Sequence, residues 1–342
     1  MKYLKYLGVR AVFFIPQLVG IVLIAFLFVR LIPGDPARLM AGPLVPEEGV
    51  EKIREQMGLT GSLAAQFWYY VTNVVQGDLG KSWYTGNTVR EDIAMRLPAT
   101  LELIVISLVL TILVVVPLAL KSVSVRKSVT RGAARRTMFG YGMLAGAFPD
   151  FWLGLLLIFI FYVQLQWAPA PVGQLDIGML PPDTITGAYV IDSLLTANWE
   201  TLWSSLTHLV LPVFVLTFVY SGAVAKIAIV TANHVKQSAY VDYAKVSGLS
   251  PGLIQKYIRK SVYPSVATMT AFTFGFLIGG AVLVETVFSW GGFGQYAVQA
   301  VVNSDFQAIQ GVVLVSALLT LLVYMLVDFI YFWVDPRIKS LG

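Results

Sequence analysis

The sequence contains no cysteine and only two histidines, and both scarcities restrict its chemistry. Without cysteine the chain forms no disulfide and offers no thiolate as nucleophile or metal ligand. The histidines, His208 and His234, do not form a zinc-binding helix motif, and no Gly-x-Ser-x-Gly hydrolase motif occurs. The sequence therefore offers no credible set of catalytic residues, and it predicts no metal site, no cofactor and no enzyme activity in this chain.

Charge is also scarce. Charged residues make up 13% of the 342 residues and hydrophobic residues 57%, and the mean hydropathy is +0.75. This composition is typical of integral membrane proteins, because a soluble domain this apolar would aggregate. Five runs contain no Asp, Glu, Lys or Arg, and a sixth is interrupted only by Asp150: Ala11–Val29, Leu103–Leu120, Thr201–Ala225, Ser261–Val284, Phe306–Val327 and Tyr141–Trp167.

Each run has about 18 or more residues, enough for a helix to cross about 30 Å of hydrocarbon. The runs lack the alternation of a membrane β-strand, and in lipid a helix satisfies its own backbone groups. We therefore predict an all-α polytopic membrane protein with one transmembrane domain over residues 1–342. The first run resembles a signal peptide but is too long, and we interpret it as a retained anchor. The six expected spans are about 9–31, 97–121, 139–166, 203–230, 261–288 and 307–333.

The distribution of the +5 net charge predicts the orientation of these spans. By the positive-inside rule, the loops rich in Lys and Arg are cytoplasmic. The acidic residues Asp176, Asp183, Asp192 and Glu200 mark the other side, so we expect 32–96 and 167–202 to be external and both termini cytoplasmic. The basic charge then reports topology, not nucleic acid binding. The basic residues of the two cytoplasmic loops are Lys121, Arg126, Lys127, Arg131, Arg135, Arg136, Lys236, Lys245, Lys256, Arg259 and Lys260.

The external segments carry short helices and one misleading motif. We expect amphipathic helices at EEGVEKIREQMGL and AAQFWYYVTNVVQ, which either cap the bundle or form a docking surface, and a short helix near Ile191 in the second segment. The stretch GDLGKS at Gly77–Ser82 approaches a phosphate-binding loop. That motif requires four residues between its glycines, whereas two occur here and Val75 occupies the place of the first glycine.

Ionisable residues within spans are costly and functional by default. Asp150, directly after Pro149, is the one carboxylate expected deep in a span, where it either pairs helices or lines a pathway. Glu285 is expected at the outer interface, 21 residues after Pro264. Glu102 and Asp328 lie near span ends, and Lys226 can extend to the interface. The glycines Gly275, Gly279 and Gly280 are expected to permit close helix packing.

The stretch YVDYAKVSGLSPG at Tyr240–Gly252 is polar although apolar runs flank it. Gly248 can adopt the left-handed conformation that ends a helix, and Ser250 and Pro251 suit the start of the next. We predict two short helices joined by a bend within a cytoplasmic segment, 234–260. Tyr240, Tyr243 and Ala244 recur at i, i+3 and i+4, which gives one small and aromatic face. That face either fits a groove in a partner or rests on lipid headgroups.

Several longer motifs carry a family resemblance. DYAKVSGLS resembles the cytoplasmic Glu-Ala-Ala…Gly loop of ATP-binding-cassette (ABC) importer permeases, and the flanking motifs are sharper. In order they look like the first permease subunit of the dipeptide, oligopeptide and nickel importer family, along nearly the entire chain. These motifs are RLIPGDPARLMAGP (30–43), GDLGKSWYTGNTV (77–89), RLPATLEL (96–103), FPDFWLGLLL (148–157), ETVFSWGGFGQ (285–295), QGVVLVSALLTLLVYMLVD (310–328) and DPRI (335–338).

The resemblance implies a type I ABC importer permease fold in the plasma or inner membrane. It implies four kinds of partner: a second homologous permease, two ATPase subunits that bind ATP and Mg, an external substrate-binding protein, and membrane lipid. The residues that it assigns to coupling with the ATPases are Tyr240, Asp242, Tyr243, Ala244, Gly248, Leu249 and Ser250.

The sequence departs from the family pattern at several positions. Asp242 and Tyr243 replace the usual Glu and Ala, Gly291 replaces a frequent proline, Asp150 replaces a frequent serine, and the spacing to Pro264 is shifted.

The sequence leaves two points open, the mode of energy coupling and the substrate. An ion-coupled secondary transporter that acts alone is an alternative, which would require buried coupling charges and discontinuous helices in two similar halves. Only Asp150 favours it. The substrate also stays open: peptides are the first expectation from the resemblance, and oligosaccharides, nickel and other small solutes are transported by members of the same family.

Overall fold

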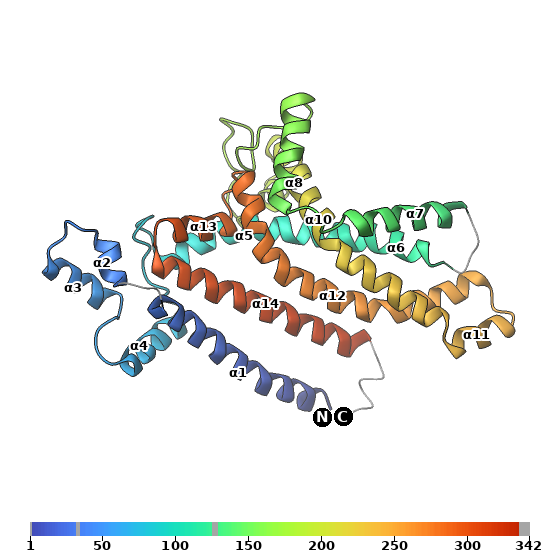
Figure 1. The fold of residues 1–342 in the computed structure, drawn as a ribbon, viewed down its shortest axis with the longest axis horizontal. Coiled ribbons are helices and arrows are strands. Elements are labelled where there is room, and N and C mark those ends of the chain that lie inside the picture. Colours follow the sequence, from blue (N-terminus) through green and yellow to red (C-terminus); the bar gives the residue numbers. More distant parts are fainter. Residues whose placement is uncertain (1, 32–34, 125–128, 335–342) are drawn as a thin grey trace. The chain divides into compact units, whose positions relative to one another are not determined.

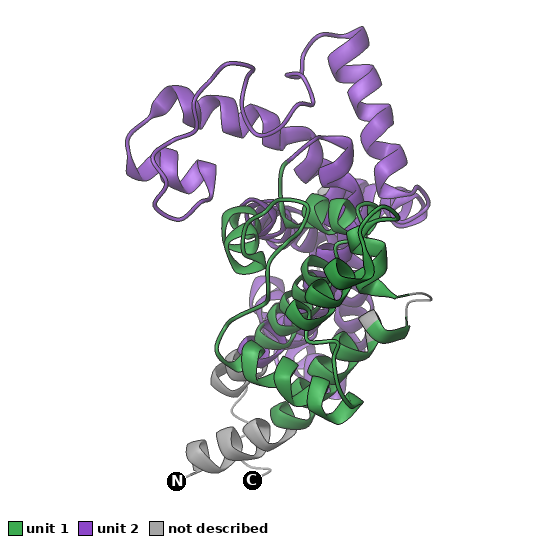
Figure 2. Ribbon diagram, turned by 90° about the vertical axis from the view of Figure 1, so that its left-hand side faces the viewer, with its two compact units in different colours: residues 1–98, 291–322, 342 green, residues 99–290, 323–341 purple. Residues whose placement is uncertain are grey.

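The computed structural model describes residues 2–31, 35–124 and 129–334. In these ranges the regular structure is helical, and the one β-type pairing is an isolated bridge between Lys81 and Thr88. The DPRI stretch at 335–338 and the basic residues Arg126 and Lys127 lie outside the described residues. The chain forms two compact units, one of residues 1–98 and 291–322 and the other of residues 99–290 and 323–341, with the last residue, 342, grouped with the first unit (Figure 2).

Within the described ranges, four helices are long and apolar enough to cross a membrane: Val89–Ser122, Trp199–Lys236, Pro251–Val287 and Phe306–Val327. Shorter apolar helical stretches occupy Phe14–Leu27 and Asp150–Gln164, where the other two spans are expected. The first long stretch comprises α5 (Val89–Leu110), a π-helical turn η1 (Thr111–Val115) and α6 (Val116–Ser122). The prediction of an all-α polytopic membrane protein is confirmed.

The third expected span, about 139–166, is not one continuous helix in the structure. It consists of α7 (Val129–Leu144), α8 (Asp150–Leu157) and the π-helical η2 (Ile158–Gln164), with a break between α7 and α8. Two residues explain the break. Gly146 has a φ of +78°, which ends a right-handed helix. Pro149 precedes the first residue of α8 and disfavours helical geometry in the residue before it.

The unit of residues 1–98 and 291–322 contains the predicted amphipathic helices. Their bounds are α3 (Glu47–Gln56) and α4 (Leu63–Val75), after α1 (Lys2–Leu31) and a short α2 (Pro36–Ala41). The unit is completed by α13 (Phe293–Val302) and the first part of α14 (Phe306–Val334). A side chain of α14 reaches the backbone of α1, because Gln310 Nε2 donates to the carbonyl oxygen of Ala25 at 3.0 Å.

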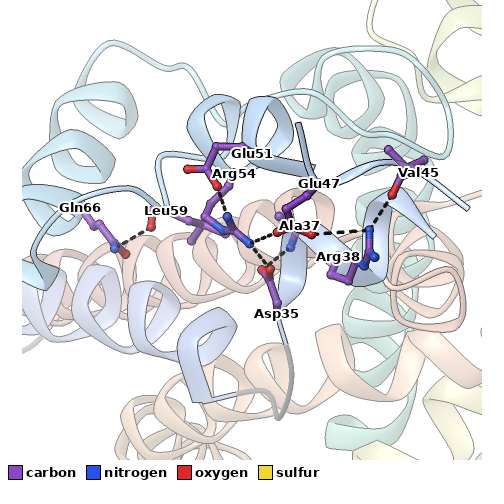
Figure 3. Close-up of polar contacts among 9 residues, drawn as sticks. All are labelled: Asp35, Ala37, Arg38, Val45, Glu47, Glu51, Arg54, Leu59 and Gln66. Carbon is purple, nitrogen blue, oxygen red and sulfur yellow. Dashed lines mark hydrogen bonds and ion pairs between the residues drawn. The ribbon is translucent and has the colours of Figure 1, made fainter. Parts of the chain in front are cut away.

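An ion-pair cluster joins α2 to α3. Asp35 caps α2 by accepting from the backbone N–H of Ala37 at 3.0 Å, and it also accepts from Arg54 on α3 (Figure 3). Arg54 bonds Glu51 as well. Burial alone would raise the pKa of Asp35, but the hydrogen bond and charge of Arg54, together with backbone hydrogen bonds from Ala37 and Arg38, hold that pKa below its usual value. The cluster therefore links two short helices through their charged side chains.

The GDLGKS stretch is a structural turn. Gly80 has a φ of +83°, and a Cβ there would lie 2.7 Å from Cδ of Gln307. Ser82 is buried and donates to Oδ2 of Asp305 at 2.5 Å, while Asp305 also caps the start of α14 by accepting from Ala308 N at 3.2 Å. Gly80 therefore lets the turn approach the start of α14. The hydroxyl of Ser82 is occupied by its hydrogen bond to Asp305.

In the unit of residues 99–290 and 323–341, α10 (Trp199–Lys236) and α12 (Pro251–Val287) pack against each other (Figure 1). A short helix, α11 (Ala239–Val246), connects their ends. The core beside α11 is formed by small and branched side chains of α6, α10 and α12, such as Ala119, Ala228 and Val262. A further short helix, α9 (Tyr189–Leu195), confirms the helix expected near Ile191.

Candidate functional site

The stop and restart predicted at residues 240–252 is confirmed. Gly248 has a φ of +75° directly after α11, and the Ser250 hydroxyl accepts from the backbone N–H of Leu253 at 3.3 Å. Pro251 is the first residue of the following helix, where its missing N–H removes no hydrogen bond. The second helix was predicted to be short, and this part of the prediction is wrong. These residues begin α12, which has 37 residues. The bend is thus continuous with a membrane span.

The face predicted from Tyr240, Tyr243 and Ala244 does not exist as one surface. Ala244 is 6% exposed and, with Val241 at 1%, packs in the core that includes Ile258 of α12. Tyr240 and Tyr243 are exposed on other sides of α11. The prediction was wrong because Val241 and Ala244, three residues apart, form the inward stripe of a helix that spans little more than two turns.

The outward side of α11 combines exposed apolar groups with a charge pair. Tyr243 is 76% exposed and Val246 88%. Asp242 accepts from Lys245 Nζ at 2.7 Å, so the two charges balance each other. Gly248 and Ser250 are exposed, and Leu249 is half-buried against the same core as Ala244. The sequence prediction missed Val246; an apolar residue two positions before the helix-ending glycine was the available signal.

A cavity of about 810 Å³ lies among α7, α10 and α12 in the same unit. Its walls are mainly apolar and aromatic, with Met138, Ile229 and Phe276 among them. The charged residues that line it are Arg135 and Lys226, and both are exposed. Lys226 and Arg135 therefore contribute two cations to a mainly apolar wall. This is additional to the predicted ability of Lys226 to extend to the membrane interface.

Asp150 bonds to a neighbouring helix. Its Oδ2 accepts from the Tyr220 hydroxyl on α10 at 2.8 Å, and its Oδ1 accepts from Phe151 N at 2.7 Å at the start of α8. Tyr220 fits here only because residue 280 is glycine: a Cβ on Gly280 would lie 1.9 Å from the Tyr220 hydroxyl oxygen. The geometry favours the helix-pairing role of Asp150, and Tyr220 also lines the cavity of α7, α10 and α12.

The predicted packing role of the glycines is confirmed at Gly280. A Cβ on neighbouring Gly279 would meet no atom within 4 Å, so that glycine faces open space.

Two glutamates near the ends of spans are bonded within the protein. Glu285 is 0% exposed and accepts from the Thr100 hydroxyl of α5. Glu102 accepts from the backbone N–H of Val190, the second residue of α9, at 3.0 Å. Both carboxylates therefore tie helices together. The side chain of Asp328 lies outside the described residues.

Asp192 organises the connection before α9. Its carboxylate is buried and accepts four hydrogen bonds, from the backbone N–H groups of Ile185, Thr186 and Gly187 and from the Thr186 hydroxyl, at 2.7–3.2 Å. Burial alone would raise the pKa of Asp192, but these hydrogen bonds outweigh it and hold the pKa below its usual value. The Asp192 side chain thus holds residues 185–187 against the start of α9 through hydrogen bonds within the segment.

Over the described residues, no group of three or more His, Asp or Glu side chains is arranged to hold a metal ion. His208 Nδ1 lies 2.8 Å from the carbonyl oxygen of Ser204, one turn earlier in α10, and its Nε2 lies 3.9 Å from Asp176 Oδ1. His234 is exposed near the end of α10. The two histidines lie far apart on one long helix.

Comparison with known proteins gives two family matches that together span almost the entire chain. Residues 123–340 match the family described as binding-protein-dependent transport system inner membrane component. Residues 3–104 match the N-terminal family of the same transport system membrane components. The departure at Gly291 also has a structural basis, because its φ of +75° is closed to the proline frequent there.

Curated relatives cover the chain from end to end. The probable D,D-dipeptide transport system permease protein DdpB of Escherichia coli (strain K12) is 39% identical over 326 residues, 94% of each chain. The di/tripeptide transport system permease protein DppB of Pseudomonas aeruginosa (strain UCBPP-PA14) is 33% identical, over 98% of this chain and 99% of the relative. The glutathione transport system permease protein GsiC of Salmonella typhimurium is 32% identical over the same shares.

The helical architecture and the bend between α11 and α12 are consistent with these matches, which cover almost the entire chain. The chain belongs to the family of inner membrane components of binding-protein-dependent transport systems, and it is a multi-pass permease subunit, not an enzyme.

Proposed function

We propose that this chain forms half of the translocation pathway of an ATP-driven ABC importer for di- or oligopeptides. The relatives named as D,D-dipeptide, di/tripeptide and glutathione transport permeases support a peptide substrate, because each matches more than nine tenths of the chain. The pathway is completed by a second homologous permease. An external binding protein delivers the peptide, and two ATPase subunits hold ATP and Mg.

The observation that carries this proposal is the outward side of α11. Tyr243 and Val246 expose large apolar surface at the end of the helix pair α10 and α12, next to a bend that begins a membrane span. Exposed apolar side chains with a neutralised charge pair beside them suit a groove on a protein partner. A partner that moves α11 displaces the start of α12 directly, and nucleotide-dependent movement of this kind shifts a permease between inward-open and outward-open states.

The cavity among α7, α10 and α12 is this chain's share of the proposed pathway. Its lining comes mainly from α7, α10 and α12, its volume of about 810 Å³ suits a short peptide, and Lys226 and Arg135 can attract a carboxylate. In this arrangement both termini and α11 are cytoplasmic, while residues 32–96 and 167–202 face outward. The basic loops of the sequence support that orientation.

The test is retention of the ATPase subunits by tagged chain in the purified complex. The double variant Tyr243→Glu/Val246→Glu places two charges on exposed positions, so the chain still folds. We expect the bound ATPase to fall more than tenfold and peptide uptake to fall with it. The matched control is Ile177→Glu/Leu180→Glu, at positions 83% and 81% exposed in the same unit, and it should retain the ATPase.

Two outcomes would contradict the proposal. Equal ATPase retention in the α11 variant and the control would mean that this surface is not the docking site. Uptake that continues without any ATPase subunit and follows a proton gradient would mean that the chain acts alone as a secondary transporter. A change confined to uptake in the control variant would instead concern the proposed outward segment, since the ATPase would remain bound.

A further inference from the structure

A second cavity lies beside the first turns of α12 and is lined by cations. It measures about 530 Å³. Lys256, Arg259 and Lys260 line it, spaced i, i+3 and i+4, so they share one face of the helix. All three side chains are exposed. Tyr263, one turn further along the same face, completes the wall with Ser124 from the end of α6.

These cations have no acidic partner among the described residues. Asp242 is the only acidic residue between Glu200 and Glu285, and it already pairs with Lys245 at 2.7 Å. A concave site with three positive charges and no carboxylate is complementary to an anion. Arg and Lys together suit a phosphate group, which accepts hydrogen bonds on several oxygens at once.

The position of the cations along α12 matches the depth of lipid headgroups. The charge-free run of this span begins at Ser261, immediately after Lys260. Lys256 lies five residues before Ser261, which is about 7 Å along a helix and comparable with the thickness of the headgroup layer on one side of a bilayer. Tyr257 and Tyr263 are 42% and 51% exposed, as expected for aromatic residues at this boundary.

We propose that this cavity, the α12 basic pocket, binds the headgroup of an anionic phospholipid. Lys256, Arg259 and Lys260 contact the phosphate, and Tyr263 packs against the glycerol and upper acyl region. The lipid would anchor the first turns of α12 at the membrane surface, next to the bend that joins α12 to α11. This lipid site is additional to the function proposed above. Only its assignment to the cytoplasmic leaflet rests on that function.

The test measures lipid retained by the complete transporter complex. Complex purified in detergent is titrated with dioleoylphosphatidylglycerol, with dioleoylphosphatidylcholine as the neutral comparison, and bound lipid is counted by native mass spectrometry. One basic side chain near an anionic surface contributes about fivefold in affinity, so we expect Lys256→Gln/Arg259→Gln/Lys260→Gln to lower phosphatidylglycerol affinity about a hundredfold. Phosphatidylcholine binding should not change.

Two further variants separate charge from folding. Lys52→Gln/Lys81→Gln/Arg90→Gln removes three exposed cations from the other compact unit and should leave affinity unchanged. Lys256→Arg/Arg259→Lys/Lys260→Arg keeps every charge and should restore most of the binding. Loss of affinity in this charge-retaining variant as large as that in the glutamine variant would overturn the proposal, because the effect would then be structural.

Three other results would also overturn it. If millimolar inorganic phosphate displaces the lipid completely, the pocket is a site for free phosphate. If the glutamine variant keeps its phosphatidylglycerol but loses the ATPase subunits, the pocket is a protein-docking surface. If the glutamine variant and the Lys52, Lys81 and Arg90 control lose lipid equally, the effect reflects net charge alone.

Discussion

Two segments of the same compact unit, 185–192 and 239–250, are both short, polar and outside the membrane spans. They differ in whether their side chains bond within the segment or remain exposed to solvent. In the first, the Asp192 carboxylate accepts four hydrogen bonds and is buried. In the second, the only ion pair is the exposed one between Asp242 and Lys245, while Tyr243 and Val246 extend outward.

The difference distinguishes a segment whose polar groups are bonded within the chain from a segment whose exposed side chains are available to a partner protein. A buried carboxylate that is fully bonded has no capacity left for a partner, and its removal costs stability. Exposed apolar side chains contribute nothing to the fold of their own chain, and their removal costs association. Substitutions in the first segment should therefore unfold it locally, and those on the outward side of α11 should leave the fold unchanged.

The largest effect on stability is expected at Asp192. Asp192→Ala leaves three part-buried backbone N–H groups without their acceptor, and we expect the free energy of local unfolding to fall by about 3 kcal/mol. Hydrogen exchange at residues 185–192, followed by mass spectrometry, measures it. Asp192→Asn keeps the volume and one acceptor oxygen and should lose about half as much. Unchanged exchange in both variants would remove the contrast between the two segments.

An intermediate effect is expected at Gly280, where the same contrast occurs between adjacent residues inside a span. Gly280→Ala must displace the Tyr220 side chain and break its bond to Asp150, which we expect to cost about 2 kcal/mol of stability in detergent. The control is Gly279→Ala, whose new methyl group meets nothing within 4 Å. A thermal denaturation midpoint lowered equally in both variants would show that packing around Tyr220 is not the cause.

The smallest effect is expected at Gly248. Gly248→Ala adds a methyl group that meets nothing within 4 Å, so its cost is limited to the positive φ and amounts to about 1 kcal/mol. Gly248→Asn should cost less, because asparagine tolerates this conformation. Hydrogen exchange at the start of α12 is the measurement. A cost several times larger in the alanine variant would mean that the bend depends on contacts beyond its own backbone.

The bend and its caps were predictable because their causes are local. The positive φ of Gly248, the Ser250 cap and the first-turn position of Pro251 each depend on one residue and its neighbours in the chain. The same kind of signal was present at Gly146 and Pro149, where a break in the third span was nevertheless not predicted. Hydropathy alone had suggested one continuous span there.

The sequence by itself determined where the apolar helical stretches lie, because hydropathy, charge and backbone preferences act within a few residues. Only the tertiary structure decided which side chains face one another. Ala244 is buried, Tyr220 reaches Asp150 across 70 residues, and Lys256, Arg259 and Lys260 line a cavity. Such contacts depend on how helices distant in sequence pack, and burial at each position is a property of that packing.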